Sequence, residues 1–142
     1  YNHHAEIIRC VHKPRFFMEI NGDKKEKLNF LHEFYVGVFC AIASPRGFED
    51  LIERMSGEVR YKKRFLDHHK YTVEELDRIF QQAKNSGADV MITTEKDAVR
   101  IPETYKPVLP LYYVRMEIEI VEGFEDFEEA VEDICKLEKE NS

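Results

Sequence analysis

The sequence predicts an α/β domain of the three-layer, Rossmann-like kind, with a mostly parallel central sheet flanked by helices and antiparallel terminal strands. Two largely apolar runs, residues 36–43 and 89–94, are typical of strands that are covered on both faces of a parallel sheet. Amphipathic helical patterns occupy residues 48–55 and 73–83. This alternation of strand and helix favours successive βαβ units.

The size and composition of the chain fit one compact domain. It has 142 residues, of which 43% are hydrophobic and 35% are charged. We therefore expect residues 1–142 to form a single α/β domain. The formal net charge of −7 argues against nucleic acid as a partner, because backbone binding needs clustered Lys and Arg side chains.

Charge and cysteine spacing disfavour a membrane-spanning or disulfide-rich protein. The longest run without charge, residues 34–45, is too short for a transmembrane helix, which needs about 20 apolar residues. Cys10, Cys40 and Cys135 share no close spacing, so neither a disulfide framework nor a cysteine-based zinc site is predicted. We therefore expect a soluble chain in a reducing, cytosolic setting.

The residues at the front of the chain are expected to add strands to the sheet. Residues 6–11 and 15–20 have strand-like patterns on either side of Pro14. The Lys- and Glu-rich segment 23–34 is expected to be helical. The run 36–43 then follows, and its continuous apolar character predicts a central position in the sheet.

A tight turn, a helix and a further strand are predicted after this run. Ser44 offers an N-cap oxygen, and Pro45 has the φ angle favoured at the first helical position. The apolar side chains that then recur at helical spacing are Phe48, Leu51, Ile52 and Met55. Alternating apolar and basic residues over 59–65 predict the next strand, with one buried face and a place near the sheet edge.

The second helix has clear start and stop signals. Thr72 and Glu75 form a capping-box pattern, in which each side chain satisfies the other residue's backbone N–H. Apolar positions on one helical face run from 73 to 83, and Gly87 supplies the stop. Residues 89–94 then predict a buried strand that ends in polar residues.

The end of the chain is expected to cap this core. Residues 114–120 alternate apolar and charged side chains like a strand, and residues 124–135 have the pattern of an amphipathic helix. Acidic residues concentrate between 117 and 140, whereas basic residues gather between 60 and 70. Both charged regions are expected to be solvated faces of a strand or helix.

Three loops are predicted to share one edge of the sheet. Because βαβ crossovers are right-handed in nearly all cases, the three strands at 36–43, 59–65 and 89–94 should be parallel and end on the same edge, where open α/β sheets bind ligands. The loops that follow these strands are residues 44–47, 66–71 and 93–97. The first loop could hold an anion at its helix start with help from Arg46, or simply cap the helix.

The second loop places a carboxylate beside two imidazoles. Asp67 precedes His68 and His69, and an imidazole suits proton transfer near neutral pH when a carboxylate fixes its tautomer. The same residues could instead form an exposed loop ahead of the following helix.

The third loop brings a cation to the end of a buried strand. Lys96 could neutralise a phosphate, or it could form a structural ion pair with a carboxylate such as Asp67. Thr94 and Asp97 are polar neighbours in the same loop.

Two segments together resemble the tetraacyldisaccharide 4'-kinase family. Residues 65–72, Phe-Leu-Asp-His-His-Lys-Tyr-Thr, closely match the family's Phe-Pro-Asp-His-His-x-Tyr-Thr. Residues 87–99, which contain Thr-Thr-Glu-Lys-Asp, resemble its downstream signature, and residues 39–48 are similar to its Phe-x-Gly-Ile-x-Asn-Pro-x-Gly-Phe. Residues 8–14 resemble the strand that joins its domains, so the likeness runs from about residue 5 to 102.

Three departures from the family pattern fall in or near the first two loops. Ala41 replaces a Gly, Ser44 replaces the usual Asn, and Leu66 replaces the Pro before Asp67. They weaken any role for the first loop and leave Asp67 and His68 unchanged.

The resemblance implies a P-loop kinase with a second, C-terminal α/β domain, which this chain would be. Such kinases transfer the γ-phosphate of ATP to the 4'-hydroxyl of a tetraacyldisaccharide 1-phosphate in the lipid A and lipopolysaccharide pathway of Gram-negative bacteria. The chain has no Gly-x-x-x-x-Gly-Lys-Ser/Thr and begins at Tyr1 without an initiator Met. We therefore expect ATP and Mg2+ to be bound mainly by a preceding P-loop domain, and this chain to be inactive alone.

The resemblance also implies roles for individual residues. His68 is expected to be catalytic, pairing across the cleft with a carboxylate of the P-loop domain and assisting removal of the acceptor proton. Asp67 would orient it or anchor the loop. The candidate interdomain or substrate contacts are His69, Thr94, Lys96 and Asp97. Residues 1–20 would belong to the interdomain strand and linker, and the parent enzyme would work at the cytoplasmic side of the inner membrane.

Two other functions remain open from the sequence. Asp-His-His is also the signature of manganese phosphoesterases, but no earlier Asp-x-Asp is present to complete a dinuclear site. The chain could also be a non-catalytic module that binds a partner or an acylated substrate. The remaining histidines lack ligand-type companions and are expected at the surface without a metal: His3, His4, His12 and His32.

Overall fold

A computed structural model describes the backbone of residues 10–120 and the side chains of residues 11–118. By its internal contacts the chain divides into two compact units, residues 15–115 and residues 1–14 with 116–142. The described strands are β1 (Cys10–Glu19), β2 (Lys25–Glu26), β3 (Tyr35–Cys40), β4 (Glu58–Arg64), β5 (Val90–Thr94) and β6 (Leu111–Ile120). The helices are the 3-10 helix η2 (Leu28–Glu33), α1 (Pro45–Met55), α2 (Val73–Asn85) and α3 (Glu95–Ala98). The predicted helix at 124–135 lies outside the described residues.

The strands form one six-stranded sheet in the order β2-β1-β6-β5-β3-β4. β4, β3, β5 and β6 are mutually parallel, whereas β2 runs antiparallel to β1. The backbone N–H of Ile20, just after β1, donates to the carbonyl of Leu111 at the start of β6 over 3.0 Å, as expected where β1 runs against β6. The predicted α/β class, mostly parallel with antiparallel strands at one end, is therefore confirmed.

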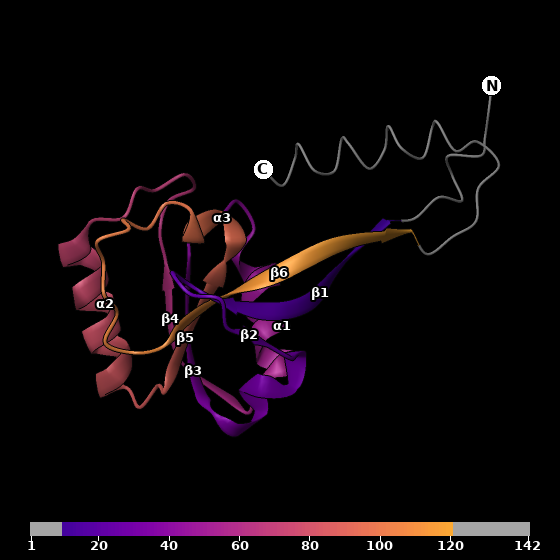
Figure 1. Cartoon of the computed structure of the whole chain (residues 1–142), viewed down its shortest axis with the longest axis horizontal. Coiled ribbons are helices and arrows are strands. Elements are labelled where there is room, and N and C mark those ends of the chain that lie inside the picture. The colour runs from indigo at the N-terminus through magenta and orange to yellow at the C-terminus, as the bar shows by residue number, and fades with distance from the viewer. Residues whose placement is uncertain (1–9, 121–142) are drawn as a thin grey trace. The chain divides into compact units, whose positions relative to one another are not determined.

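Helices cover both faces of the parallel strands, with α1 and α2 on opposite sides of β3 and β4 (Figure 1). Successive side chains of β3 alternate between these layers. Phe39 packs edge-on against Phe80 of α2 at a centroid distance of 5.9 Å, within one continuous buried cluster. Val38 and Cys40 lie on the other side of the strand, and burial raises the pKa of the Cys40 thiol to about 12. The predicted buried run is therefore an interior strand.

The front of the chain differs from the prediction in two places. β1 is one continuous strand through Pro14, where two strands were expected. On the side of β2 it needs no N–H from the proline, because β2 pairs with Phe17 and Met18. The segment 23–34 contains a short strand and a 3-10 helix in place of a longer helix. Its apolar residues begin only at Leu28, and Leu31 is fully buried, so the charged start of the segment, residues 23–27, has no apolar stripe to bury as a helix.

Two predicted helix caps are only partly realised. Ser44 occupies the N-cap position of α1, but its side chain makes no capping hydrogen bond, so the predicted N-cap interaction is missing. Thr72 accepts a hydrogen bond from the Glu75 N–H over 3.2 Å, but the Glu75 carboxylate bonds to His69, so only half of the capping box forms. Gly87 has a φ of 93° after the end of α2, which confirms its predicted role as the stop.

The basic face of β4 is neutralised within the fold. Arg64 makes a two-pronged contact with Glu49 of α1, over 2.6 and 2.8 Å, and its hydrogen bonds lower the pKa of that buried carboxyl. Lys62 pairs with Glu53, also on α1. Charged residues on a sheet edge discourage pairing with other chains, so these basic residues have a structural explanation. Within residues 10–120, no helix is long and apolar enough to cross a membrane.

Candidate functional site at the carboxyl edge of the sheet

The three loops predicted to share one edge are held together by a single buried carboxylate. Oδ1 of Asp97 accepts from the backbone N–H of Ala41 over 3.1 Å and from the Tyr71 hydroxyl over 3.0 Å. Ala41 follows β3, Tyr71 belongs to the loop after β4, and Asp97 lies in α3 directly after β5. Asp97 therefore joins the ends of three strands and is completely buried.

Local sequence explains how Asp97 reaches this position. Thr94 ends β5 and caps α3, because its hydroxyl oxygen accepts from the Asp97 N–H over 3.1 Å. The same hydroxyl donates to Oδ2 of Asp97 over 2.6 Å. The burial of Tyr71 and its position beside Asp97 raise the pKa of the tyrosine, so its hydroxyl remains a donor to the carboxylate. Thr94 and Asp97 thus face the interior of the edge.

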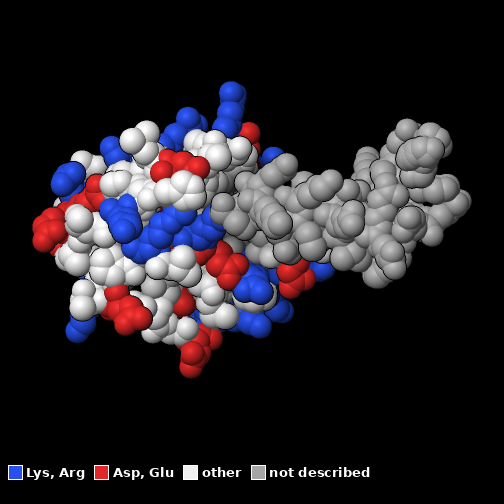
Figure 2. All heavy atoms as spheres, turned by 90° about the horizontal axis from the view of Figure 1, so that it is seen from above, with Lys and Arg blue, Asp and Glu red and all other residues white. Residues whose placement is uncertain are grey.

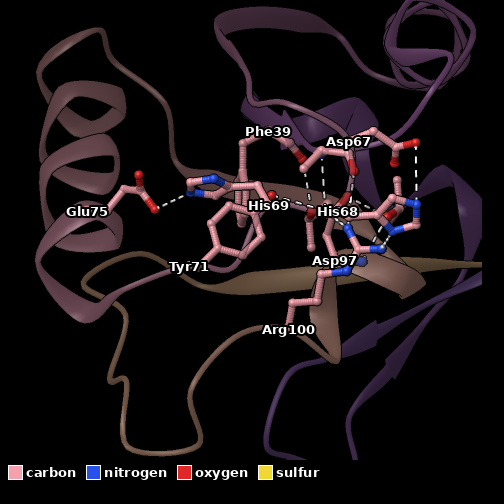
Figure 3. Close-up of polar contacts among 11 residues, drawn as sticks. Phe39, Asp67, His68, His69, Tyr71, Glu75, Asp97 and Arg100 are labelled. Carbon is pink, nitrogen blue, oxygen red and sulfur yellow. Dashed lines mark hydrogen bonds and ion pairs between the residues drawn. The ribbon is translucent and has the colours of Figure 1, made fainter.

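His68 is exposed and held in an uncommon backbone conformation. Its φ of 66° lies in the left-handed region, and its backbone N–H donates to the carbonyl of Ala41 over 3.3 Å. One guanidinium nitrogen of Arg100 lies 3.2 Å from His68 Nδ1 (Figure 3). His68 Nε2 lies 3.6 Å from Asp67, beyond a good hydrogen bond, and the imidazole side chain is 69% exposed. The loop therefore presents His68 Nε2 at the surface.

His69 faces the opposite way and is anchored in the fold (Figure 3). Its Nε2 lies 2.6 Å from the Glu75 carboxylate of α2, and its ring stacks on Phe65 at a centroid distance of 4.7 Å. Tyr71 meets the same ring edge-on. A cavity of about 470 Å3 borders His69, with Lys63 and Arg78 in its lining. The two neighbouring imidazoles therefore have different surroundings, one fixed inside and one exposed.

Lys96 sits close to the charged groups around His68. Partial burial lowers its pKa most, Asp67 opposes this, and the nearby Arg100 guanidinium adds to the lowering. Figure 2 views the edge on which α3 lies from above, and Lys and Arg atoms form a band near the middle of the described surface. This edge therefore combines cations with an exposed imidazole, a combination suited to an anionic ligand or a reacting phosphate.

A comparison with known families identifies the family to which this chain belongs. The family model described as Tetraacyldisaccharide-1-P 4'-kinase matches residues 2–136. The chain belongs to the tetraacyldisaccharide-1-P 4'-kinase family. The resemblance seen in the Asp-His-His and Thr-Thr-Glu-Lys-Asp segments is therefore confirmed over most of the sequence.

Curated relatives from several bacteria are similar over most of this chain. A tetraacyldisaccharide 4'-kinase of Elusimicrobium minutum is 34% identical over 134 residues, which cover 92% of this chain and 35% of that protein. The corresponding kinase of Anaeromyxobacter dehalogenans is 35% identical over 126 residues, covering 87% of this chain and 33% of the relative. The chain thus spans about a third of the length of the curated family members it matches.

A solved structure supports the fold. The crystal structure of an LpxK from Aquifex aeolicus in complex with ATP superposes with a TM-score of 0.53 at 14% sequence identity. The match covers 92% of this chain and 35% of that protein. At this identity the similarity establishes a shared fold.

One residue at the carboxyl edge of the sheet, Arg100, was not predicted from the sequence. Arg100 touches the His68 ring, and its other terminal nitrogen donates to the Ala41 carbonyl over 3.1 Å. The available signal was its position three residues after Asp97, one helical turn further along the same edge. That spacing carries no information about His68, which is 32 positions away in the sequence.

The described part of the chain contains no set of metal ligands of the kind that a manganese phosphoesterase would need. Between residues 11 and 118, no three His, Cys, Asp or Glu side chains come together in a group that could hold a metal ion. His12 and His32 are exposed, as predicted, while His3 and His4 lie outside the described residues. Kinase family membership accounts for the Asp-His-His segment without a phosphoesterase site.

Proposed function

We propose that this chain is the C-terminal α/β domain of a kinase that transfers the γ-phosphate of ATP to the 4'-hydroxyl of a tetraacyldisaccharide 1-phosphate, a step in lipid A biosynthesis. The observation that carries this proposal is the family match over residues 2–136, which includes both segments of the carboxyl edge. The structure of that edge supports it, because cations and an exposed imidazole lie together there.

In this proposal His68 is the catalytic residue of the domain. Phosphoryl transfer needs a group that orients or deprotonates the acceptor hydroxyl, and His68 presents its Nε2 to the surface from a fixed loop. Its left-handed φ supports a functional role, since uncommon backbone conformations of non-glycine residues concentrate at functional sites. His68 would pair with a carboxylate of the P-loop domain across the cleft.

The neighbouring residues have supporting roles in the proposal. Asp67 lies 3.6 Å from His68 Nε2, and Lys96 lies close enough to Asp67 for the two charges to interact; both would contact the substrate or the preceding domain. His69, Thr94 and Asp97 would act through the shape of the edge, because their side chains bond within it. Asp67 and Lys96 would therefore contact the ligand or the preceding domain, whereas His69, Thr94 and Asp97 would hold the loops.

ATP and Mg2+ would be held mainly by a P-loop domain of the same polypeptide. The carboxyl edge described here has no glycine-rich phosphate cradle, because the connection from β3 to α1, residues 41–44, contains no glycine and Gly47 lies within α1. Its own residues would orient the acceptor hydroxyl and contribute positive charge. Residues 1–20 would belong to the strand and linker between the domains, and the parent enzyme would act on its lipid at the cytoplasmic face of the inner membrane.

An assay with the full-length polypeptide tests this function. Purified in detergent, it should transfer labelled γ-phosphate from ATP to tetraacyldisaccharide 1-phosphate, and should not label an analogue methylated at the 4'-hydroxyl. Residues 1–142 alone should transfer none, because phosphoryl transfer requires the phosphate-binding groups that they lack. Absence of transfer by the full-length polypeptide, or labelling of the methylated analogue, would refute the proposed reaction.

A further inference from the structure

We propose that Arg100 is a positioning residue for His68, which fixes the imidazole ring and keeps its hydrogen on Nε2. This inference rests on the catalytic role proposed for His68. It concerns a residue with no assigned role, 32 positions further along the chain from the histidine.

The contact between Arg100 and His68 determines the tautomer. A guanidinium group has only donors and stays protonated at any physiological pH. The Arg100 nitrogen lies 3.2 Å from His68 Nδ1, so Nδ1 must use its lone pair to accept. In a neutral imidazole one nitrogen carries the hydrogen, which leaves it on Nε2. His68 is therefore a hydrogen-bond donor at its exposed nitrogen.

Arg100 is itself fixed in place. Its Nη1 donates to the Ala41 carbonyl over 3.1 Å and lies 3.7 Å from Asp97, and its side chain is only 20% exposed. The backbone N–H of His68 donates to the same Ala41 carbonyl. The backbone of His68 and the guanidinium group are thus both held against the end of β3. A fixed partner of this kind restricts the histidine to one orientation.

This arrangement assigns a direction to the proton chemistry at His68. With Nδ1 occupied by Arg100 and a hydrogen on Nε2, the neutral imidazole has no free lone pair for the acceptor proton. His68 would instead donate its Nε2 hydrogen bond to a carboxylate of the P-loop domain. As the 4'-oxygen forms its bond to the γ-phosphorus, the bond from that phosphorus to the β,γ-bridging oxygen of ATP would break and ADP would leave. The acceptor proton would pass to that carboxylate, and His68 would keep its own hydrogen.

The wild-type enzyme provides the first test, which needs no change at Arg100. Nitrogen NMR of the full-length polypeptide labelled with 15N-histidine should show an unprotonated Nδ1 and a protonated Nε2 for His68 near neutral pH. The His68→Gln variant identifies the signals by subtraction. A His68 spectrum with the hydrogen on Nδ1 would overturn the inference.

Amide replacements of His68 test the direction of donation. The terminal amide of Gln can place an N–H near the position of Nε2, whereas the shorter amide of Asn reaches only the position of Nδ1. We expect His68→Gln to retain at least about tenfold more kcat than His68→Ala, the scale of one hydrogen bond. His68→Asn should be as slow as the alanine variant. Equal rates for the Gln and Ala variants would contradict a donor role.

Substitution of Arg100 tests whether it acts through His68. In the full-length enzyme, Arg100→Met should lower kcat by about 10- to 100-fold, the range that misplacement of a catalytic group produces. Arg100→Lys, which can still donate to Nδ1, should recover part of this loss. Neither change should alter the KM for ATP beyond about twofold, because Arg100 is not assigned a contact with the nucleotide.

A double-mutant cycle separates this inference from the function on which it rests. In a His68→Ala background, Arg100→Met should cause no further loss of kcat, since its target is gone. Additive losses would show that Arg100 acts elsewhere, and would overturn the inference while the role of His68 stands. An unchanged kcat in His68→Ala would instead refute the proposed function itself.

Discussion

Replacement of His68 by alanine in the full-length enzyme is expected to lower kcat by about 10²- to 10³-fold, within the range for a group that assists proton transfer. The KM for ATP should stay within about twofold, because nucleotide binding is assigned to another domain. The loss should be in catalysis and not in folding, because His68 presents its Nε2 at the carboxyl edge without packing into the core. Steady-state kinetics with ATP and the acylated disaccharide provide the measurement.

His69 supplies a matched control for this experiment. It is the adjacent residue with the same side chain, but its ring is stacked on Phe65 and bonded to Glu75. His69→Ala should destabilise the domain by about 1–3 kcal/mol, because packing is lost and the Glu75 carboxylate is left unpaired. At temperatures below its melting temperature, the variant should keep kcat within about threefold of the wild-type value. A larger loss of kcat in His69→Ala than in His68→Ala would contradict the proposal that His68 is catalytic and His69 is structural.

Replacement of Asp97 should have the largest effect on stability. Asp97→Ala removes the acceptor for the Ala41 N–H and the Tyr71 hydroxyl, and leaves the partly buried Arg100 without its carboxylate. Removing one member of a buried charged network typically costs about 3–5 kcal/mol. The three loops should then separate, so thermal denaturation of the full-length enzyme should show a lower melting temperature for the transition of this domain.

Asp97→Asn tests the reason for that loss. The amide keeps the shape of the side chain and one oxygen acceptor, so the Ala41 N–H remains satisfied while the negative charge is lost. We expect a smaller destabilisation of about 1–2 kcal/mol. If the alanine variant melts at the wild-type temperature, Asp97 does not hold the loops together, and the edge must be stabilised in another way.

Much of the fold follows from local patterns, because buried strands and amphipathic helices leave a strong periodic signal. β3 is apolar along its length since helices cover both of its faces, and α2 is framed by Thr72 and Gly87. The alternating, basic pattern of β4 correctly indicated an edge strand. Parallel pairing of β3 with β4 and β5 then brought the three loops to one side, because parallel strands end at the same edge of a sheet.

The contacts within the site could not be predicted in the same way, since they join residues distant in the sequence. Asp97 accepts from residues 56 and 26 positions away, so its burial has no local signature. Glu75 abandons the capping box because His69 offers a partner from the preceding loop, and tertiary context thereby overrides a local preference. The Arg100 contact with His68 likewise depends on how two loops fold against the end of β3.

The carboxyl edge of this domain is proposed to complete an active site with a nucleotide-binding domain. A crystal structure of the full-length polypeptide with a non-hydrolysable ATP analogue and Mg2+ tests it most directly. We predict that His68 Nε2 lies about 2.6–3.2 Å from a carboxylate oxygen of the P-loop domain, with the γ-phosphate of the analogue in the same cleft. A structure in which His68 faces solvent, away from the nucleotide, would contradict the account.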